Sequence, residues 1–87
     1  MKIVFAKRFR KQYQSAPEQV KRDFNERLEI FAEDRQAATL GNHALKGKLK
    51  GYRSINVTED WRAIFREAKT GNHIIFVLLG KHSELYG

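Results

Sequence analysis

The residues best suited to chemistry begin with a run of cations in the second half of the chain. Residues 36–57 contain no carboxylate. Four cations lie close together within this stretch, separated by glycines and a tyrosine: Lys46, Lys48, Lys50 and Arg53. Closely spaced Lys and Arg side chains can neutralise successive phosphates of a nucleic acid. This segment is therefore the best candidate for a phosphate-binding surface.

Three histidines, His43, His73 and His82, are the other candidates, and the chain has no cysteine. The pKa of free imidazole lies near cellular pH, so a histidine exchanges protons at little cost. Without thiolates or clustered carboxylates nearby in the sequence, a zinc site is not expected. A lone histidine is more often structural than catalytic, so a proton-transfer role needs further motifs around it.

Composition favours a basic, globular protein with a polyanionic partner. The 87 residues suit one domain spanning residues 1–87, and a hydrophobic fraction of 41% is enough for a core. The formal charge is +7, although residues 17–34 are locally acidic. Charge interrupts the N-terminal apolar residues too early for a signal peptide, and no stretch is long enough to span a membrane. We expect a cytoplasmic protein without a membrane partner.

The first half of the sequence predicts a strand and two helices. Residues 1–6 alternate as in a strand, and residues 7–14 form a short basic helix with Phe9 and Tyr13 on one side. Ser15 and Glu18 flank Pro17 in the pattern of a capping box, which would start a second helix ending near Arg35. The second helix carries an apolar stripe suited to packing on a sheet: Val20, Phe24, Leu28 and Phe31.

The second half predicts an antiparallel meander. Residues 52–58 and 61–68 read as a hairpin, and residues 73–79 as a central strand after a turn at 69–72. The expected fold class is α+β, in which two helices pack on one face of an antiparallel sheet of about four strands, in the order β-α-α-β-β-β.

Four short motifs carry a family resemblance. They are His43-Ala44-Leu45-Lys46-Gly47, Lys50-Gly51-Tyr52-Arg53, Asp60-Trp61-Arg62, and the closing Gly80-Lys81-His82-Ser83-Glu84-Leu85-Tyr86. The chain resembles the RelE/ParE toxin superfamily, and most closely its YafQ-like branch of ribonucleases. The resemblance spans nearly the whole chain and implies a RelE-like fold. The ending His-Ser-Glu-Leu-Tyr is the most discriminating motif, because the others also occur in members that do not cut RNA.

The resemblance implies a toxin of a type II toxin–antitoxin system. Members of this branch are mRNA interferases: they cleave messenger RNA in the 30S decoding site of the ribosome and inhibit translation. They use neither a cofactor nor a metal. The expected partners are therefore messenger RNA, the ribosome and a small acidic antitoxin that restrains the toxin.

Site residues follow from the same resemblance, position by position. The implied catalytic residues are His82, Asp60, His43 and Tyr86. Such chemistry removes a proton from a 2′-hydroxyl, stabilises the crowded phosphate and protonates the leaving oxygen, with His82 as acid and Asp60 or His43 as base. The expected RNA-binding residues are Lys46, Lys48, Lys50, Arg53, Trp61, Arg62 and Lys81. Asp60 would equally suit a turn cap, and Trp61 a place in the core.

Two positions depart from the family pattern. Asn56 stands where close relatives carry a histidine, and Leu78 where they carry an arginine. Asn56 cannot shuttle a proton near neutral pH, and Leu78 cannot offset phosphate charge. Two alternatives therefore stay open: a non-catalytic, ParE-like inhibitor of DNA gyrase, and a degenerate toxin that only binds its antitoxin.

Overall fold

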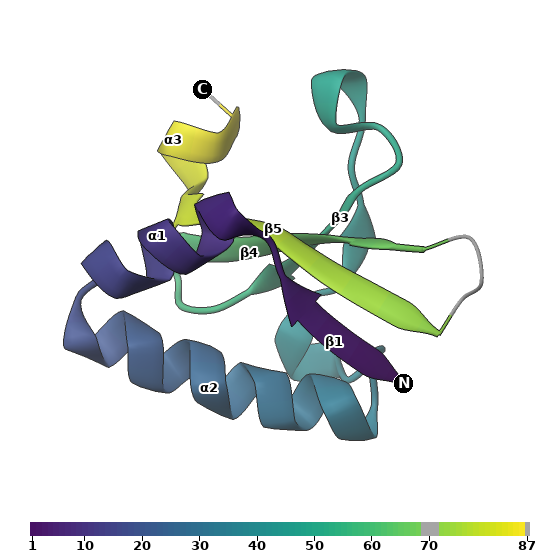
Figure 1. Cartoon of the computed structure of the whole chain (residues 1–87), viewed down its shortest axis with the longest axis horizontal. Coiled ribbons are helices and arrows are strands. Elements are labelled where there is room, and N and C mark those ends of the chain that lie inside the picture. The colour runs from purple at the N-terminus through teal and green to yellow at the C-terminus, as the bar shows by residue number, and fades with distance from the viewer. Residues whose placement is uncertain (69–71, 87) are drawn as a thin grey trace.

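The computed structural model describes residues 1–68 and 72–86, except for the side chain of Tyr86. Figure 1 shows helices and strands arranged around one twisted sheet. The elements, in chain order, are β1 (Lys2–Phe5), α1 (Lys7–Ser15), α2 (Glu18–Glu33), the 3-10 helix η1 (Ala38–Leu40), β2 (His43–Ala44), the 3-10 helix η2 (Gly47–Leu49), β3 (Arg53–Asn56), β4 (Trp61–Glu67), β5 (His73–Lys81) and α3 (His82–Tyr86).

The α+β class expected from the sequence is confirmed, but the sheet is larger than predicted and mixed. The described residues form five strands in the order β1-β5-β4-β3-β2. Strand β1 runs parallel to β5, whereas the other neighbours are antiparallel. The two-residue strand β2 is too short to show an alternating pattern, and the direction of β1 depends on a partner about seventy residues away.

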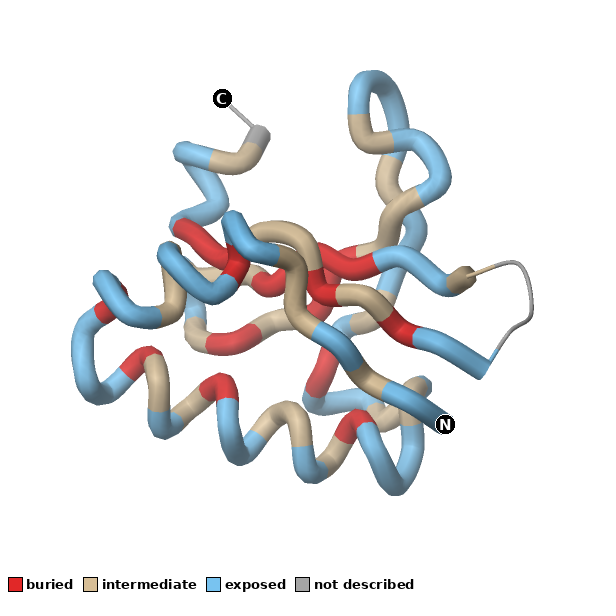
Figure 2. Tube along the Cα trace, in the orientation of Figure 1, coloured by how far each residue is buried: buried red, intermediate tan, exposed pale blue. Residues whose placement is uncertain are grey.

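The apolar stripe of α2 packs on one face of the sheet, which we call the helix face. Val20, Phe24 and Phe31 are buried, and Leu28 packs against the same core at its edge. The core centres on Phe76 in β5, whose ring centroid lies 5.4 to 5.9 Å from those of five other aromatic residues: Phe5, Phe9, Phe24, Phe31 and Phe65. Figure 2 shows the buried residues concentrated in the central strands and at intervals along α2.

Strand register assigns the remaining side chains to the opposite face, which we call the α3 face. Directly paired residues point to the same side of a sheet. Two cross-strand rows therefore share this face, namely Ser54 with Ile64 and Leu78, and Asn56 with Arg62 and Gly80. A bulge at Val77 shifts the pairing from Ile64/Leu78 to Phe65/Phe76, so Phe76 and Leu79 both reach the helix face.

Two local predictions at helix ends differ from the structure. The capping box at Ser15 and Glu18 is wrong: Ser15 is the last residue of α1, Pro17 is the N-cap of α2, and within the described chain no side chain caps that end. The C-terminal helix α3 was not predicted, because five residues are too few for a helical period. No helix in the described part of the chain is long and apolar enough to cross a membrane.

Candidate active site

The β3–β4 turn meets the start of α3 at one end of the sheet. Trp61, the first residue of β4, pairs with Lys81, the last residue of β5. The next backbone group, the His82 N–H, donates a hydrogen bond of 2.8 Å to the carbonyl oxygen of Asp60. Both Asp60 and His82 are exposed. The fold thus joins the two implied acid–base residues through their backbones, although they lie far apart in the sequence.

Arg62 organises the turn that presents Asp60. Its Nη1 donates to the carbonyl oxygens of Thr58, Glu59 and Trp61 at 2.8, 2.9 and 3.0 Å. The hydroxyl of Thr58 accepts hydrogen bonds from the backbone N–H groups of Asp60 and Trp61 at 3.3 and 3.1 Å. The guanidinium predicted to bind RNA therefore makes three internal contacts in the turn.

Helix α3 begins at His82 and lies against β5. The Lys81 N–H donates a 3.1 Å hydrogen bond to Oε1 of Glu84, which is the backward half of a capping box. A Cβ atom on Gly80 would lie 3.3 Å from Cδ2 of Leu85, so the missing side chain lets the helix pack closely. Sequence reasoning missed Glu84, although a glutamate three residues after a strand end is a recognisable start signal for a helix.

His43 lies in β2, an edge strand that β3 and β4 separate from β5. It pairs with Ser54, which pairs with Ile64, which in turn pairs with Leu78. Three strand spacings separate the backbones of His43 and Leu78 by roughly 14 Å, and His82 lies further along β5. The Nδ1 atom of His43 is 2.9 Å from the carbonyl oxygen of Gly41. The strand order brings Asp60 and His82 together and leaves His43 apart from them.

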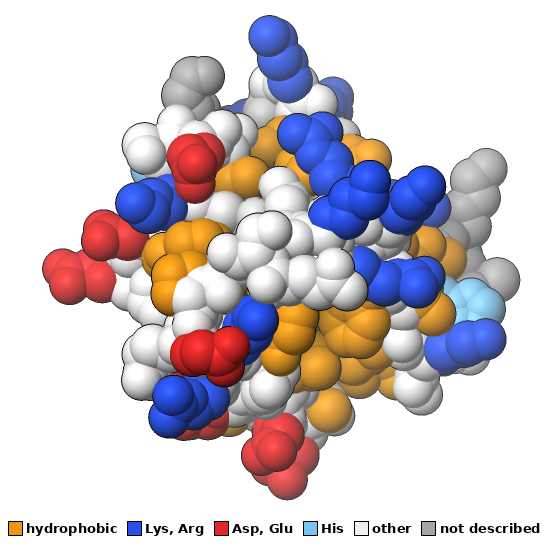
Figure 3. Space-filling model, turned by 60° about the vertical axis from the view of Figure 1, so that its left-hand side comes forward, with side chains coloured by type: hydrophobic (Ala, Val, Ile, Leu, Met, Phe, Trp, Pro, Cys, Tyr) orange, Lys and Arg blue, Asp and Glu red, His pale blue; other side chains and the backbone are white. Residues whose placement is uncertain are grey.

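The cationic loop between β2 and β3 carries three exposed lysines, Lys46, Lys48 and Lys50. A 2.9 Å hydrogen bond from the Leu45 N–H to the Tyr52 carbonyl closes the loop at its base. In Figure 1 the loop with η2 and helix α3 both project from the side of the sheet opposite α2. Figure 3 shows basic side chains gathered from the top to the right of one molecular face, with most acidic side chains to the left and below.

The other predicted RNA-binding residues have mixed surroundings. Lys81 is exposed, and Trp61 is half-buried against the core. Arg53 pairs with Phe65, which places it on the helix face, and its Nε donates to Oδ1 of Asn42 at 2.8 Å. Arg53 also borders a cavity of about 280 Å³ that reaches Tyr52 and Glu67. The side chain of Tyr86 lies outside the described part of the structure.

The two positions that depart from the family pattern both lie on the α3 face. Asn56 is in the row of Arg62 and Gly80, and Leu78 is in the row of Ser54 and Ile64. The Asn56 side chain lies against Gly41, where a Cβ atom would be 2.5 Å from Nδ2. Asn56 therefore packs against the backbone at Gly41, two residues before His43.

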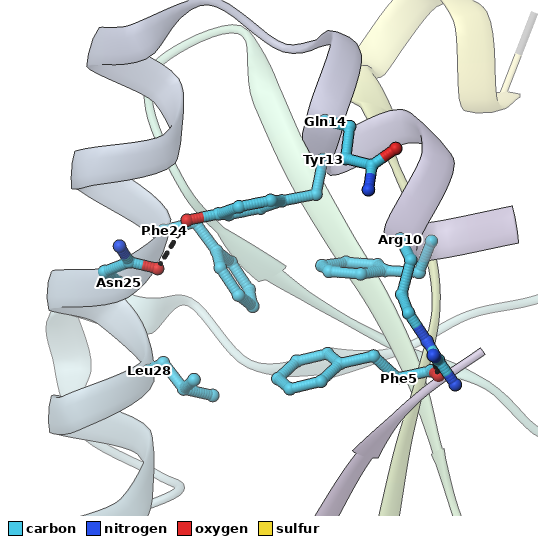
Figure 4. A pocket seen from close by; sticks show the side chains of 8 residues that line it. Phe5, Arg10, Tyr13, Gln14, Phe24, Asn25 and Leu28 are labelled. Atoms are coloured by element: carbon cyan, nitrogen blue, oxygen red, sulfur yellow. Dashed lines mark hydrogen bonds between the residues drawn. The ribbon is translucent and has the colours of Figure 1, made fainter. Parts of the chain in front are cut away.

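A larger cavity lies elsewhere, in the helical layer. Figure 4 shows this cavity, of about 430 Å³, with aromatic side chains of β1, α1 and α2 around it. The Tyr13 hydroxyl donates to Oδ1 of Asn25 at 3.0 Å, and Nε of Arg10 donates to the Phe5 carbonyl at 3.0 Å. Its lining is mainly apolar and contains neither a histidine nor a carboxylate, so it is separate from the candidate active site.

The α+β fold with its mixed sheet matches that of RelE-like toxins. The sequence matches the family described as bacterial toxin of type II toxin-antitoxin system, YafQ, over residues 1–87. The chain therefore belongs to the YafQ toxin family. No curated protein sequence matches it significantly.

Solved structures of related toxins share this fold. Escherichia coli YafQ is 21% identical with a TM-score of 0.81, covering 98% of this chain and 97% of that one. A YoeB/ParE toxin from Agrobacterium tumefaciens is 21% identical with a TM-score of 0.78, covering 94% and 99%. The archaeal RelE-RelB complex from Pyrococcus horikoshii matches with 19% identity and a TM-score of 0.72, covering 92% of both chains.

Proposed function

We propose that this type II toxin is a cytoplasmic endoribonuclease that cuts messenger RNA on the ribosome without a metal or cofactor. One observation carries the proposal: the 2.8 Å hydrogen bond from the His82 N–H to the Asp60 carbonyl. It joins a residue with an imidazole to one with a carboxylate, two groups that can serve as acid and base in metal-free RNA cleavage. Membership of the YafQ family supports the same reaction.

In the proposed reaction, the Asp60 carboxylate takes the proton of the substrate 2′-hydroxyl. The 2′-oxygen then attacks the adjacent phosphorus, and the bond from phosphorus to the 5′-oxygen breaks. His82, protonated beforehand, gives its proton to that leaving oxygen. The products are a 2′,3′-cyclic phosphate and a free 5′-hydroxyl. We favour Asp60 over His43 as base because the strand order separates His43 from His82.

Binding of the RNA is assigned to the exposed cations and the neighbouring aromatic residues. Lys46, Lys48 and Lys50 contact the phosphate backbone, and Lys81, next to His82, stabilises charge near the scissile phosphate. Trp61 and Tyr86 stack on a base, a contact worth roughly 1–3 kcal/mol. Arg53 contributes less to binding, because its Nε already donates to Asn42.

The test replaces His82 by Gln and measures both translation arrest and cleavage of ribosome-bound messenger RNA. Loss of a general acid lowers the rate by roughly 10²–10⁴-fold, and the D60N variant has a comparable defect. The matched control is H73Q, because His73 is exposed at the opposite end of β5 and belongs to none of the family motifs. Full arrest by H82Q would refute the mechanism.

A gyrase inhibitor is the second candidate, and Asn56 and Leu78 favour it. Both stand on the α3 face without the proton-shuttling or cationic group of close relatives. Mapping RNA ends and DNA breaks after induction separates the two functions. Ribonuclease activity yields discrete internal cuts in messenger RNA, and gyrase poisoning yields DNA breaks. Normal growth after induction would identify a degenerate toxin that binds only its antitoxin.

The proposed partner of the free toxin is a small acidic antitoxin. The formal charge of +7 and the three exposed lysines of the β2–β3 loop supply the complementary surface. We expect the antitoxin to cover this loop or to displace α3. A structure of the complex in which both stay exposed would contradict this mode of inhibition.

A further inference from the structure

The backbone at the start of α3 is held from two sides. The first N–H groups of a helix lack backbone acceptors within the helix itself. Here the Lys81 N–H donates to Oε1 of Glu84 at 3.1 Å, and the His82 N–H donates to the Asp60 carbonyl at 2.8 Å. One acceptor belongs to α3 and the other to the β3–β4 turn. The peptide groups on both sides of Lys81 are thus fixed immediately before the His82 side chain.

The turn side of this arrangement depends on Arg62. Its Nη1 reaches the carbonyl oxygens of Thr58, Glu59 and Trp61 at 2.8 to 3.0 Å. These carbonyls flank the Asp60 carbonyl in the sequence, and the Asp60 carbonyl accepts from His82 instead. By binding the carbonyls on both sides of Asp60, the Arg62 guanidinium therefore sets the direction of the Asp60 carbonyl, which accepts the hydrogen bond from α3.

We infer that Arg62 and Glu84 are positioning residues that set where the His82 imidazole lies relative to Asp60. Neither needs to touch the RNA: Arg62 acts through the turn and Glu84 through the first peptide groups of α3. The inference rests on the proposed function, and it assigns Arg62 a role other than the phosphate contact predicted from the sequence. A displacement of about 1 Å at a reacting group can lower the rate a hundredfold.

Glu84 is tested with two matched variants. E84A removes the acceptor, whereas E84Q keeps an oxygen at the same position and removes only the charge. We expect E84A to lower kcat on ribosome-bound messenger RNA by about tenfold or more with little change in KM, and E84Q to restore most of it. Equal losses in both variants would show that the charge of Glu84 acts directly. Wild-type kcat in both would also overturn the inference.

Arg62 is tested with R62Q and R62K, because an arginine that contacts a phosphate and an arginine that binds turn carbonyls tolerate lysine differently. A phosphate accepts lysine in place of arginine, whereas the lysine Nζ lies one atom closer to the backbone than the Nη1 that reaches the three carbonyls. We expect kcat to fall in both variants while the salt dependence of RNA binding stays the same. A salt slope reduced by about 0.7 in R62Q and restored in R62K would identify a phosphate contact instead. The charge-matched control is R22Q, on an exposed residue of α2.

A second readout does not require catalysis. Amide hydrogen exchange of the free toxin, followed by NMR, reports on the Lys81 and His82 N–H groups directly. We expect E84A to speed exchange at Lys81 and R62Q to speed exchange at His82, with the protection of the β5 core unchanged. Wild-type protection of both amides in these variants would refute the inference. If the wild-type toxin cuts no RNA, the proposed function fails, and amide exchange still decides whether Arg62 and Glu84 hold this backbone.

Discussion

The two faces of the sheet are held together by different forces. On the helix face, five phenylalanine rings surround Phe76, with centroids 5.4 to 5.9 Å from its own. On the α3 face, the start of a short helix is fixed by hydrogen bonds from the Lys81 N–H to Glu84 and from the His82 N–H to the β3–β4 turn, in which Arg62 donates to the carbonyls. Apolar burial dominates folding stability, whereas directional bonds determine geometry. Changes on the helix face should therefore affect stability first, and changes on the α3 face activity first.

The largest effect on stability is expected from F76A. Phe76 is fully buried, and its removal leaves a cavity among five rings, so the free energy of unfolding should fall by about 3–5 kcal/mol. Urea denaturation measures this, with F76L as the milder control that refills part of the space. An F76A protein that unfolds at the wild-type urea concentration would contradict the claim that packing on the helix face determines stability.

A smaller effect is expected at Gln12, which connects the helical layer to the end of β5. Its Oε1 accepts a 2.8 Å hydrogen bond from the partly buried Leu79 N–H. The Q12M variant keeps the length of the side chain but leaves this N–H without its acceptor, which should cost about 1–3 kcal/mol. Q12E retains an oxygen acceptor and is the control. Equal stability of the two variants would show that this bond contributes nothing.

A pair of glycines tests the corner beside His43. Gly41 and Gly47 have φ values of +56° and +66°, so alanine at either costs about 1–2 kcal/mol. Only at Gly41 would the new Cβ also meet Asn56, at 2.5 Å from Nδ2. Thermal unfolding should therefore show a lower melting temperature for G41A than for G47A. Adding N56A to both variants should reduce this difference. Equal melting temperatures for the two single variants would argue against the close contact.

The smallest effect on stability is expected in the cationic loop. Replacing Lys46, Lys48 and Lys50 together by Gln should change the free energy of unfolding by no more than about 0.5 kcal/mol, because all three are exposed. The salt slope of RNA binding should nevertheless fall by about 2, for three lost phosphate contacts. The control replaces Lys2, Lys7 and Lys11, which lie in β1 and α1. An identical fall of the salt slope in the control would show that RNA binding depends only on the net charge of the protein.

The helices and the helix-face core could be predicted closely because periodicity reports burial directly. The stripe Val20, Phe24, Leu28 and Phe31 predicted α2 and its inner face, and residues 73–79 predicted the central strand β5. The helix α3 and the strand β2 were missed. Both are too short to repeat a pattern, and their stability comes from contacts with β5 and β3.

The candidate site was predictable in residue type but not in arrangement. Sequence motifs pointed to Asp60 and His82, yet Glu84 and the internal contacts of Arg62 were not foreseen. The contacts of Glu84 and Arg62 lie within four residues of each side chain, whereas the bond from the His82 N–H to the Asp60 carbonyl joins distant residues. Predicting that bond would require knowing that the β3–β4 turn meets the end of β5, which follows from the pairing of Trp61 with Lys81. Local sequence carries no record of such a pairing.

By itself, the sequence determined the α+β class, the basic surface and the residue types available for acid–base chemistry, because composition and short-range periodicity depend only on neighbouring residues. Tertiary structure alone decided the parallel pairing of β1 with β5, the closeness of Asp60 to His82 and the distance of His43 from them. The physical reason is that backbone hydrogen bonds between strands join residues far apart in the sequence, which local patterns do not specify.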